Sequence, residues 1–108
     1  MIVIASKYLV PKGYTAITLF PFIFLRHKKL KEDTILMNHE RIHLCQQAEL
    51  LVVFFYLWYI AEYLLRLIQY ANHADAYRNI SFEREAYTHE SHNNYLTNRP
   101  LWNFLKFI

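Results

Sequence analysis

Residues that break helices are almost absent from the C-terminal two thirds of this chain. Gly13 is the single glycine among 108 residues, and no proline lies between Pro21 and Pro100. Glycine and proline interrupt a helix more strongly than any other residue. The sequence therefore predicts one or two long helices beginning at about Ile35. The same lack of glycine excludes a phosphate-binding loop and the dinucleotide-binding fingerprint, because both need several glycines.

The composition is that of a small, core-forming domain. Hydrophobic residues make up 55% of the chain and aromatic residues 18%, which is too apolar for a disordered protein. We expect one domain over residues 1–108, since about 100–150 residues is the usual domain size. Cys45 is the only cysteine, and we expect it to pack as a small hydrophobe. Because one cysteine cannot form a disulfide framework, stability must come from packing, a metal, a partner or lipid.

The expected fold class is α+β, with residues 1–31 as the strand region. Met1–Ala5 is a β-branched apolar run that predicts one strand. The apolar stretch Tyr14–Leu25 contains Pro21, which predicts two short strands or one bent edge strand rather than a helix.

Two helical regions follow. Residues 32–70 begin with the capping side chains of Glu32-Asp33-Thr34 and continue as the long helical stretch. The best candidate for a break is Asn72–Asp75, so residues 71–108 form a separate region. Within it, Asn79 or Ser81 can cap a further helix before a short C-terminal tail.

Positive charge is concentrated at the N-terminal end. Residues 1–31 carry six basic and no acidic side chains, whereas residues 32–108 carry six basic and nine acidic ones. The only dense basic run is Arg26–Lys31, which we interpret as a solvated loop, and we expect no nucleic-acid partner. Met1–Ala5 has neither the basic start nor the length of a secretory signal, so the expected location is the cytoplasm or a membrane surface.

The segment His39-Glu40-Arg41-Ile42-His43 matches the pattern H-E-x-x-H within the predicted helix. Two histidines four residues apart are rotated by about 400° around a helix, so they project from one face and can bind the same zinc ion. Glu40 lies beside the first histidine and can act as a general base toward a zinc-activated water. The pattern therefore predicts a site for one Zn²⁺.

A catalytic zinc site needs a third protein ligand. A metzincin would place a glycine three residues after the second histidine and a ligand three residues further on. Those positions hold Gln46 and Glu49 here. Because the helix continues through Gln46, Glu49 is rotated by about 120° relative to His43 and lies more than one turn away. Glu49 therefore cannot complete the site.

The pattern H-E-x-x-H together with Glu83-Arg84-Glu85-Ala86 resembles the gluzincin metallopeptidases, and at this length most closely the minigluzincins. The resemblance spans roughly residues 15–90. It implies a zincin-like fold in which a small N-terminal sheet packs on the histidine helix and on a second, glutamate-bearing helix. It implies Glu83 as the third ligand, with Glu90 and Glu85 as lesser candidates. It also implies peptide hydrolysis, with an extended substrate on a free edge of a strand at Phe22–Arg26.

Tyr87 departs from the family pattern. The family has an aspartate at this position, which orients a ligand histidine from outside the coordination shell. Tyr87, His89, Asp75 or a main-chain carbonyl can take that role. His73, His89 and His92 are candidates for binding a transition-state oxyanion, although each also reads as an ordinary exposed histidine. The departure leaves a non-catalytic zinc-binding domain as an alternative function.

An unbroken apolar block covers residues 50–61 and extends to Ile68 if Glu62 and Arg66 are tolerated. The two charged residues are four apart and predict an intrahelical ion pair. The extended block is close to the length of about twenty residues that spans a bilayer. It predicts a buried core helix, a membrane contact or a homo-oligomer contact. A membrane-associated interaction protein, in which H-E-x-x-H is accidental, is therefore a further alternative.

Overall fold

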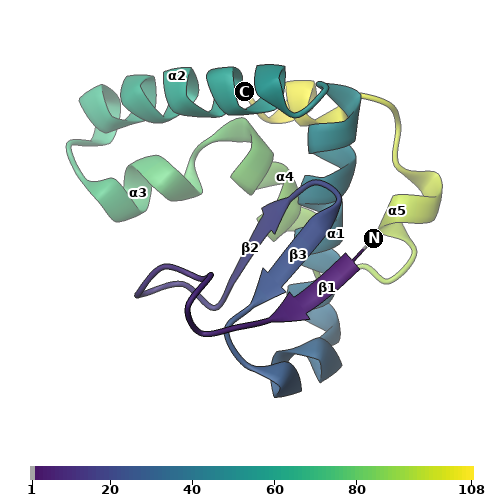
Figure 1. Cartoon of the computed structure of the whole chain (residues 1–108). Helices are drawn as coiled ribbons and strands as arrows, with labels where there is room; N and C mark the ends of the chain where they lie inside the picture. The colour runs from purple at the N-terminus through teal and green to yellow at the C-terminus, as the bar shows by residue number, and fades with distance from the viewer. Residues whose placement is uncertain (1) are drawn as a thin grey trace.

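A three-stranded sheet lies at the N-terminal end of the computed structural model, which describes residues 2–108 (Figure 1). Its strands are β1 (Ile2–Ala5), β2 (Ala16–Leu19) and β3 (Phe22–Leu25), in the order β1-β3-β2. The prediction of two short strands around Pro21 is confirmed. The strand predicted over Met1–Ala5 is confirmed from Ile2 onward, and Met1 lies outside the described residues.

The middle position of β3 corrects one expectation. β3 pairs in parallel with β1 and antiparallel with β2, so both of its edges are occupied. Arg26, just beyond the strand, donates its main-chain N–H to the Thr15 carbonyl at 2.9 Å. The prediction that Phe22–Arg26 offers a free edge to a peptide is therefore wrong. The outer strands are β1 and β2, because β1 enters the sheet on the far side of β3.

One face of the sheet packs against helix α1 (Thr34–Glu49). Ile23 and Leu25 of β3 are fully buried in the cluster that joins the sheet to this helix, whereas Phe22 and Phe24 on the opposite face are half-buried. Asp33 caps α1 by accepting the main-chain N–H of Leu36 at 3.0 Å, as its position in the predicted capping segment indicates.

The remaining elements follow in chain order. They are η1 (Lys28–Glu32) before α1, and then α2 (Val53–Tyr70), α3 (His73–Arg78), α4 (Ser81–His89), α5 (Tyr95–Asn98) and η2 (Asn103–Phe107). The predicted break at Asn72–Asp75 is confirmed, since the Asn72 side chain accepts the main-chain N–H of Asp75 and so caps α3.

The long helical stretch also breaks sharply between α1 and α2. The two helices meet at 112°. Leu51 and Val52 at this corner have φ values of 56° and 53°, a conformation that a β-branched residue rarely adopts. Ala71 and Trp102 have similar positive φ values. The chain therefore still makes these turns despite its single glycine, because other residues adopt the left-handed conformation.

Glu62 links α2 to the start of α4. Its carboxylate accepts the main-chain N–H of Ser81 at 2.5 Å and the Ser81 hydroxyl at 2.6 Å, so it caps α4 in place of an Asn79 or Ser81 side chain. The predicted ion pair between Glu62 and Arg66 is present at 3.6 Å. The carboxylate of Glu62, a charged residue in a largely apolar helix, therefore forms its contacts inside the protein.

A second, aromatic core lies under α2. Phe55, Ile80, Phe82 and Phe104 are buried there and join α2, α4 and η2. Within residues 2–108, no single helix is long and apolar enough to cross a membrane; α1 and α2 meet that test only as a bent pair, by length and composition.

Candidate metal centre

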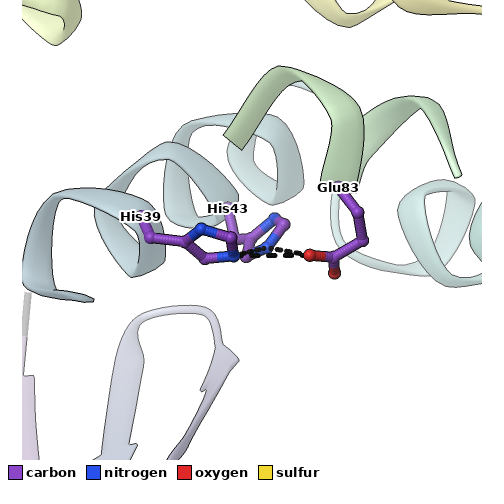
Figure 2. A group of neighbouring side chains, drawn as sticks. All are labelled: His39, His43 and Glu83. Carbon is purple, nitrogen blue, oxygen red and sulfur yellow. Dashed lines mark hydrogen bonds and ion pairs between the residues drawn. The ribbon is translucent and has the colours of Figure 1, made fainter. Parts of the chain in front are cut away.

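His39 and His43 of α1 converge with Glu83 of α4 (Figure 2). The Nε2 atoms of the two histidines are 3.2 Å apart, and Glu83 Oε1 lies 3.3 Å from that of His39 and 3.2 Å from that of His43. Ligands in a tetrahedral zinc site at 2.0–2.1 Å stand about 3.3 Å from one another. The three donor atoms are therefore spaced to hold one metal ion, and all three side chains are buried.

Local helix geometry places the three ligands. The spacing of four residues brings both histidines to the face of α1 that meets α4, and Glu83 lies in the first turn of α4. Ala86, one turn further along α4, is fully buried, and its small side chain lets the two helices approach closely. The triad predicted from the motif and the resemblance is thus brought together.

Gln46 holds the imidazole of His43. Its Oε1 lies 2.8 Å from His43 Nδ1, while its Nε2 donates to the carbonyl of Phe82 and to Glu85 Oε1. Because both donor bonds use the amide nitrogen, Oε1 must accept a proton from His43 Nδ1. His43 Nε2 is then free to bind a metal. This role was not predicted, although Gln46 lies one helical turn beyond His43.

Glu90 lies beside the other ligand histidine. Its Oε2 is 3.4 Å from Nδ1 of His39, a buried atom that has no hydrogen-bond partner in the described chain. Glu90 therefore faces the side of the ring that points away from the metal cluster. It lies outside the group of three donor atoms, and it can accept the proton that His39 Nδ1 must carry when Nε2 binds a metal.

The other predicted supporting residues lie elsewhere. Tyr87 contacts His39 with its ring, at a centroid distance of 4.7 Å, and the guanidinium of Arg78 lies over the Tyr87 ring at 4.2 Å. His89 stacks on Tyr95, and its Nδ1 lies 3.0 Å from that of His92. Asp75 is exposed at the start of α3. Of the residues predicted to orient a ligand, only Tyr87 touches one.

The remaining glutamates of the region have structural partners. Glu85 is fully buried, accepts hydrogen bonds from Gln46, Tyr95 and Arg99, and lies outside the metal cluster. Glu49 pairs with Arg99 at 2.7 Å and lies outside the metal cluster. Cys45 is half-buried and lies outside the cluster.

Two hydroxyl groups hold the acidic side chains of the centre. Thr18 of β2 donates its hydroxyl to Glu40 Oε2 at 2.5 Å, and Tyr59 of α2 donates to Glu83 Oε2 at 2.9 Å. Neither contact was predicted, since no local pattern joins residues separated by more than twenty positions. Oε1 of Glu83 thus lies beside the two histidines, while Oε2 is held by the hydroxyl of Tyr59.

Electrostatics couple Glu83 to His43. Burial alone lowers the pKa of His43, but the carboxylate of Glu83 and its hydrogen bond outweigh this and raise the pKa to about 9. Burial raises the pKa of Glu83, but the histidines outweigh it and hold that pKa far below its ordinary value. Without a metal, the centre therefore holds a histidinium–carboxylate pair at neutral pH.

We expect zinc binding at pH 7 to release about one proton from His43, and the apparent affinity to rise about tenfold per pH unit up to pH 9. The raised pKa also means that this pair stabilises the metal-free fold fully below pH 6.5 and less as the pH rises through about 9. Calorimetric titration of zinc in buffers of different ionisation enthalpy measures the proton count. His92→Gln is the control, and a titration heat that does not depend on the buffer would contradict the prediction.

Loss of the Gln46 amide is expected to weaken zinc binding by about 10–100-fold, the usual cost of removing a group that orients a ligand histidine. Gln46→Met keeps the side-chain length but removes the acceptor for His43 Nδ1. Competition with a chromogenic chelator measures the affinity. Cys45→Ser, on the neighbouring residue, serves as the control. Equal affinities for Gln46→Met and the control would show that Gln46 has no role at the metal.

A cavity of about 420 Å³ opens beside the centre. Glu40, His43 and Glu83 lie in its wall, which is otherwise dominated by β2 and by tyrosines of α2 and α3. His73 also lines it and hydrogen-bonds to Tyr63. Glu40 and two residues of the metal cluster, His43 and Glu83, therefore face one open cavity that can admit a substrate group.

Comparisons of the chain with models of protein families, with curated proteins and with solved structures find no match.

Proposed function

We propose that the protein is a zinc-dependent peptidase. The observation that carries the proposal is the set of three buried ligand atoms at 3.2–3.3 Å from one another, with Glu40 next to the first ligand and in the wall of the same cavity. Two histidines and a glutamate are a ligand set typical of catalytic zinc in peptidases, which leaves a fourth position open.

The zinc ion would be held by His39, His43 and Glu83, and would supply polarisation of a carbonyl and acidification of a water. Glu40 would take a proton from the attacking water and return it to the leaving nitrogen. The hydroxyl of Thr18 restricts the rotation of Glu40 and keeps its carboxylate in the cavity. Tyr59 and Gln46 would keep the ligands in place while the substrate binds.

An outer strand beside the cavity supports a peptide substrate. β2 pairs with β3 on one side only, and Ala16 and Thr18 line the cavity. At the end of this edge, Gln47 accepts the main-chain N–H of Phe20 and donates to the Thr18 carbonyl, as a neighbouring strand would. A peptide would therefore pair with β2 near Ala16 and end its pairing at Thr18.

The test is metal analysis combined with hydrolysis of a mixed peptide library. We expect about one zinc per chain, loss of hydrolysis on chelation and recovery when zinc is restored. Glu83→Gln should lower the zinc content, whereas His92→Gln, which changes an exposed histidine, should not. Hydrolysis that survives complete removal of the metal would exclude the proposal.

A non-catalytic metal-binding domain is the second candidate. The hydrogen bond from Thr18 to Glu40 favours it, because that bond engages the carboxylate that would otherwise act as the base. Stoichiometric zinc without hydrolysis of any library peptide would select this candidate over the first.

A further inference from the structure

The outward face of α2 is apolar along its whole length. Its exposed side chains are Val53, Phe54, Leu57, Trp58, Ile60, Ala61, Leu64, Leu65, Ile68 and Gln69. At about 100° per residue these positions cover an arc of about 180°, and the apolar positions alone, without Gln69 at one margin, cover about 160°. Ile68 is 83% exposed. α2 runs along the edge of the molecule, with α3 on its inner side (Figure 1).

The two charged residues of α2 lie at the margin of this face, where they line the hollow that it shares with Ile108, and both are buried. Glu62 is 7% exposed and binds Ser81, and Arg66 is 9% exposed and lies beside Glu62. All residues of α2 belong to the described chain, and none on the outward face is charged. Both charged groups therefore have polar partners within the protein and do not interrupt the apolar surface.

The C-terminal segment enlarges the apolar surface. Leu101, Trp102, Leu105 and Ile108 are all exposed. Ile108 shares a shallow hollow with side chains of the outward face of α2, including Phe54, Leu57 and Leu65. We call the outward face of α2 and these four C-terminal residues the apolar platform. A continuous exposed surface of this kind marks a contact with a partner or a membrane.

We propose that the apolar platform inserts into the interfacial layer of a lipid bilayer, with α2 lying parallel to the membrane plane. The inner face of α2 packs on α3 and on the aromatic core, so lipid can cover only its outer half. An 18-residue helix is about 27 Å long, which suits an amphipathic helix that lies at the boundary of headgroups and acyl chains. Tryptophan is the residue type favoured at that depth, and both tryptophans of the chain, Trp58 and Trp102, belong to the platform.

A second copy of the chain fits this surface less well. One packed helix covers a stripe of about 100°, which leaves much of the apolar arc of about 160° in water. A bilayer covers the whole arc because it adapts to the shape of the helix.

The structure also separates the platform from the basic run. Lys28–Glu32 forms η1 before the first residue of α1, whereas α2 begins after its last. The 16 residues of α1 place these ends about 24 Å apart. Membrane binding through the platform is therefore driven by apolar burial, and it should not depend on salt or on anionic lipid.

The metal centre would lie close to the membrane surface. His43 and His39 are 6 and 10 residues before the end of α1, or about 9 and 15 Å along the helix from the corner with α2. Ile60 is exposed on the platform and also lines the cavity of the centre. The cavity thus has a wall in common with the surface that meets lipid.

Phosphatidylcholine vesicles and the full chain test this proposal. Trp58 and Trp102 report on the platform directly, so vesicles should shift the emission of the wild type to shorter wavelength, and lipids brominated on the acyl chains should quench it. Sedimentation should show binding that is equal in 0.05 and 0.5 M salt, within about twofold. Leu57→Gln with Leu64→Gln should weaken the partition coefficient at least about tenfold. Lys28→Gln with Lys29→Gln is the matched control and should bind like the wild type.

Other outcomes would overturn the proposal. Binding that disappears at high salt, or in the lysine variant, would assign membrane contact to the basic run. A wild type that ignores vesicles and forms a dimer that the leucine variant dissociates would assign the platform to a second copy. A monomer that does not bind vesicles would leave the platform without a lipid role. None of these measurements requires hydrolysis, so failure here and failure of the proposed peptidase function remain distinguishable.

Discussion

Replacement of Glu40 by glutamine is expected to reduce peptide hydrolysis by about 10²–10⁴-fold, the usual contribution of a general base, and to leave about one zinc per chain. Glutamine has the same shape and can still accept the hydroxyl proton of Thr18 through Oε1. It cannot accept a proton from water at neutral pH. Because Glu40 lies outside the group His39, His43 and Glu83 that could hold the metal, the metal content should not change.

The rate of hydrolysis and the bound metal should be measured on the same preparations. Glu32→Gln, in η1, provides a control that removes an exposed carboxylate outside the metal cluster. Equal activity in the wild type and Glu40→Gln, with zinc bound to both, would remove Glu40 from the reaction. Loss of zinc in Glu40→Gln would instead show that Glu40 supports the metal site.

Arg99→Leu is expected to lower the free energy of unfolding by about 3–5 kcal/mol, the usual cost of leaving a buried charge without its partner. Arg99 binds both carboxylate oxygens of Glu49, at 2.7 and 2.9 Å, and contacts Glu85 at 2.5 and 3.1 Å. It thereby joins the end of α1, the middle of α4 and the C-terminal tail. Leucine fills part of the space but leaves two carboxylates buried together.

Thermal unfolding of the metal-free proteins at pH 7 should show a midpoint at least about 10 °C lower for Arg99→Leu. Arg41→Leu, which removes an exposed arginine from α1, should change stability by no more than about 0.5 kcal/mol. Equal losses in the two variants would mean that the network around Arg99 contributes nothing specific.

The stability difference should also depend on pH. Burial raises the pKa of Glu85, but the hydrogen bonds from Arg99, Tyr95 and Gln46 outweigh it, so the net pKa is lowered from 4.5. In the wild type this carboxylate therefore stabilises the fold above pH 4.5 and loses that effect as the pH falls through its folded-state pKa. The difference between the wild type and Arg99→Leu should therefore narrow as the pH falls below 4.5, where the wild type loses this stabilisation. A constant difference would exclude the buried carboxylates as its cause.

Local features were predictable where the cause lies within a few residues. Asp33 caps α1 because its side chain reaches an N–H three residues ahead. His39 and His43 face one another because four residues make about one helical turn. Pro21 separates two strands because it cannot donate to a strand ladder. These expectations needed no knowledge of the rest of the fold.

The supporting contacts of the metal centre were predicted poorly. Tyr87 replaces the expected aspartate, and the sequence offered Asp75 and His89 as substitutes. Asp75 is exposed in α3 and His89 stacks on Tyr95. It is Glu90, just after α4, that lies beside Nδ1 of His39. In the sequence, Gln46 is notable only because it stands where a metzincin would have glycine, yet its side chain hydrogen-bonds to the imidazole of His43. Such roles depend on the distance between helices, which a periodic pattern does not contain.

From the sequence alone one could predict a histidine pair on one helix, a glutamate beside it and an apolar block whose role stayed open between core, membrane and oligomer contact. The packing of separate elements then brings Glu83 to His43 across 40 residues, makes β3 the middle strand and buries Glu62 and Arg66. The difference lies in the range of the forces involved. Helix periodicity and capping act over three or four residues, whereas strand order, ligand closure and the direction of an apolar face depend on how separate elements pack.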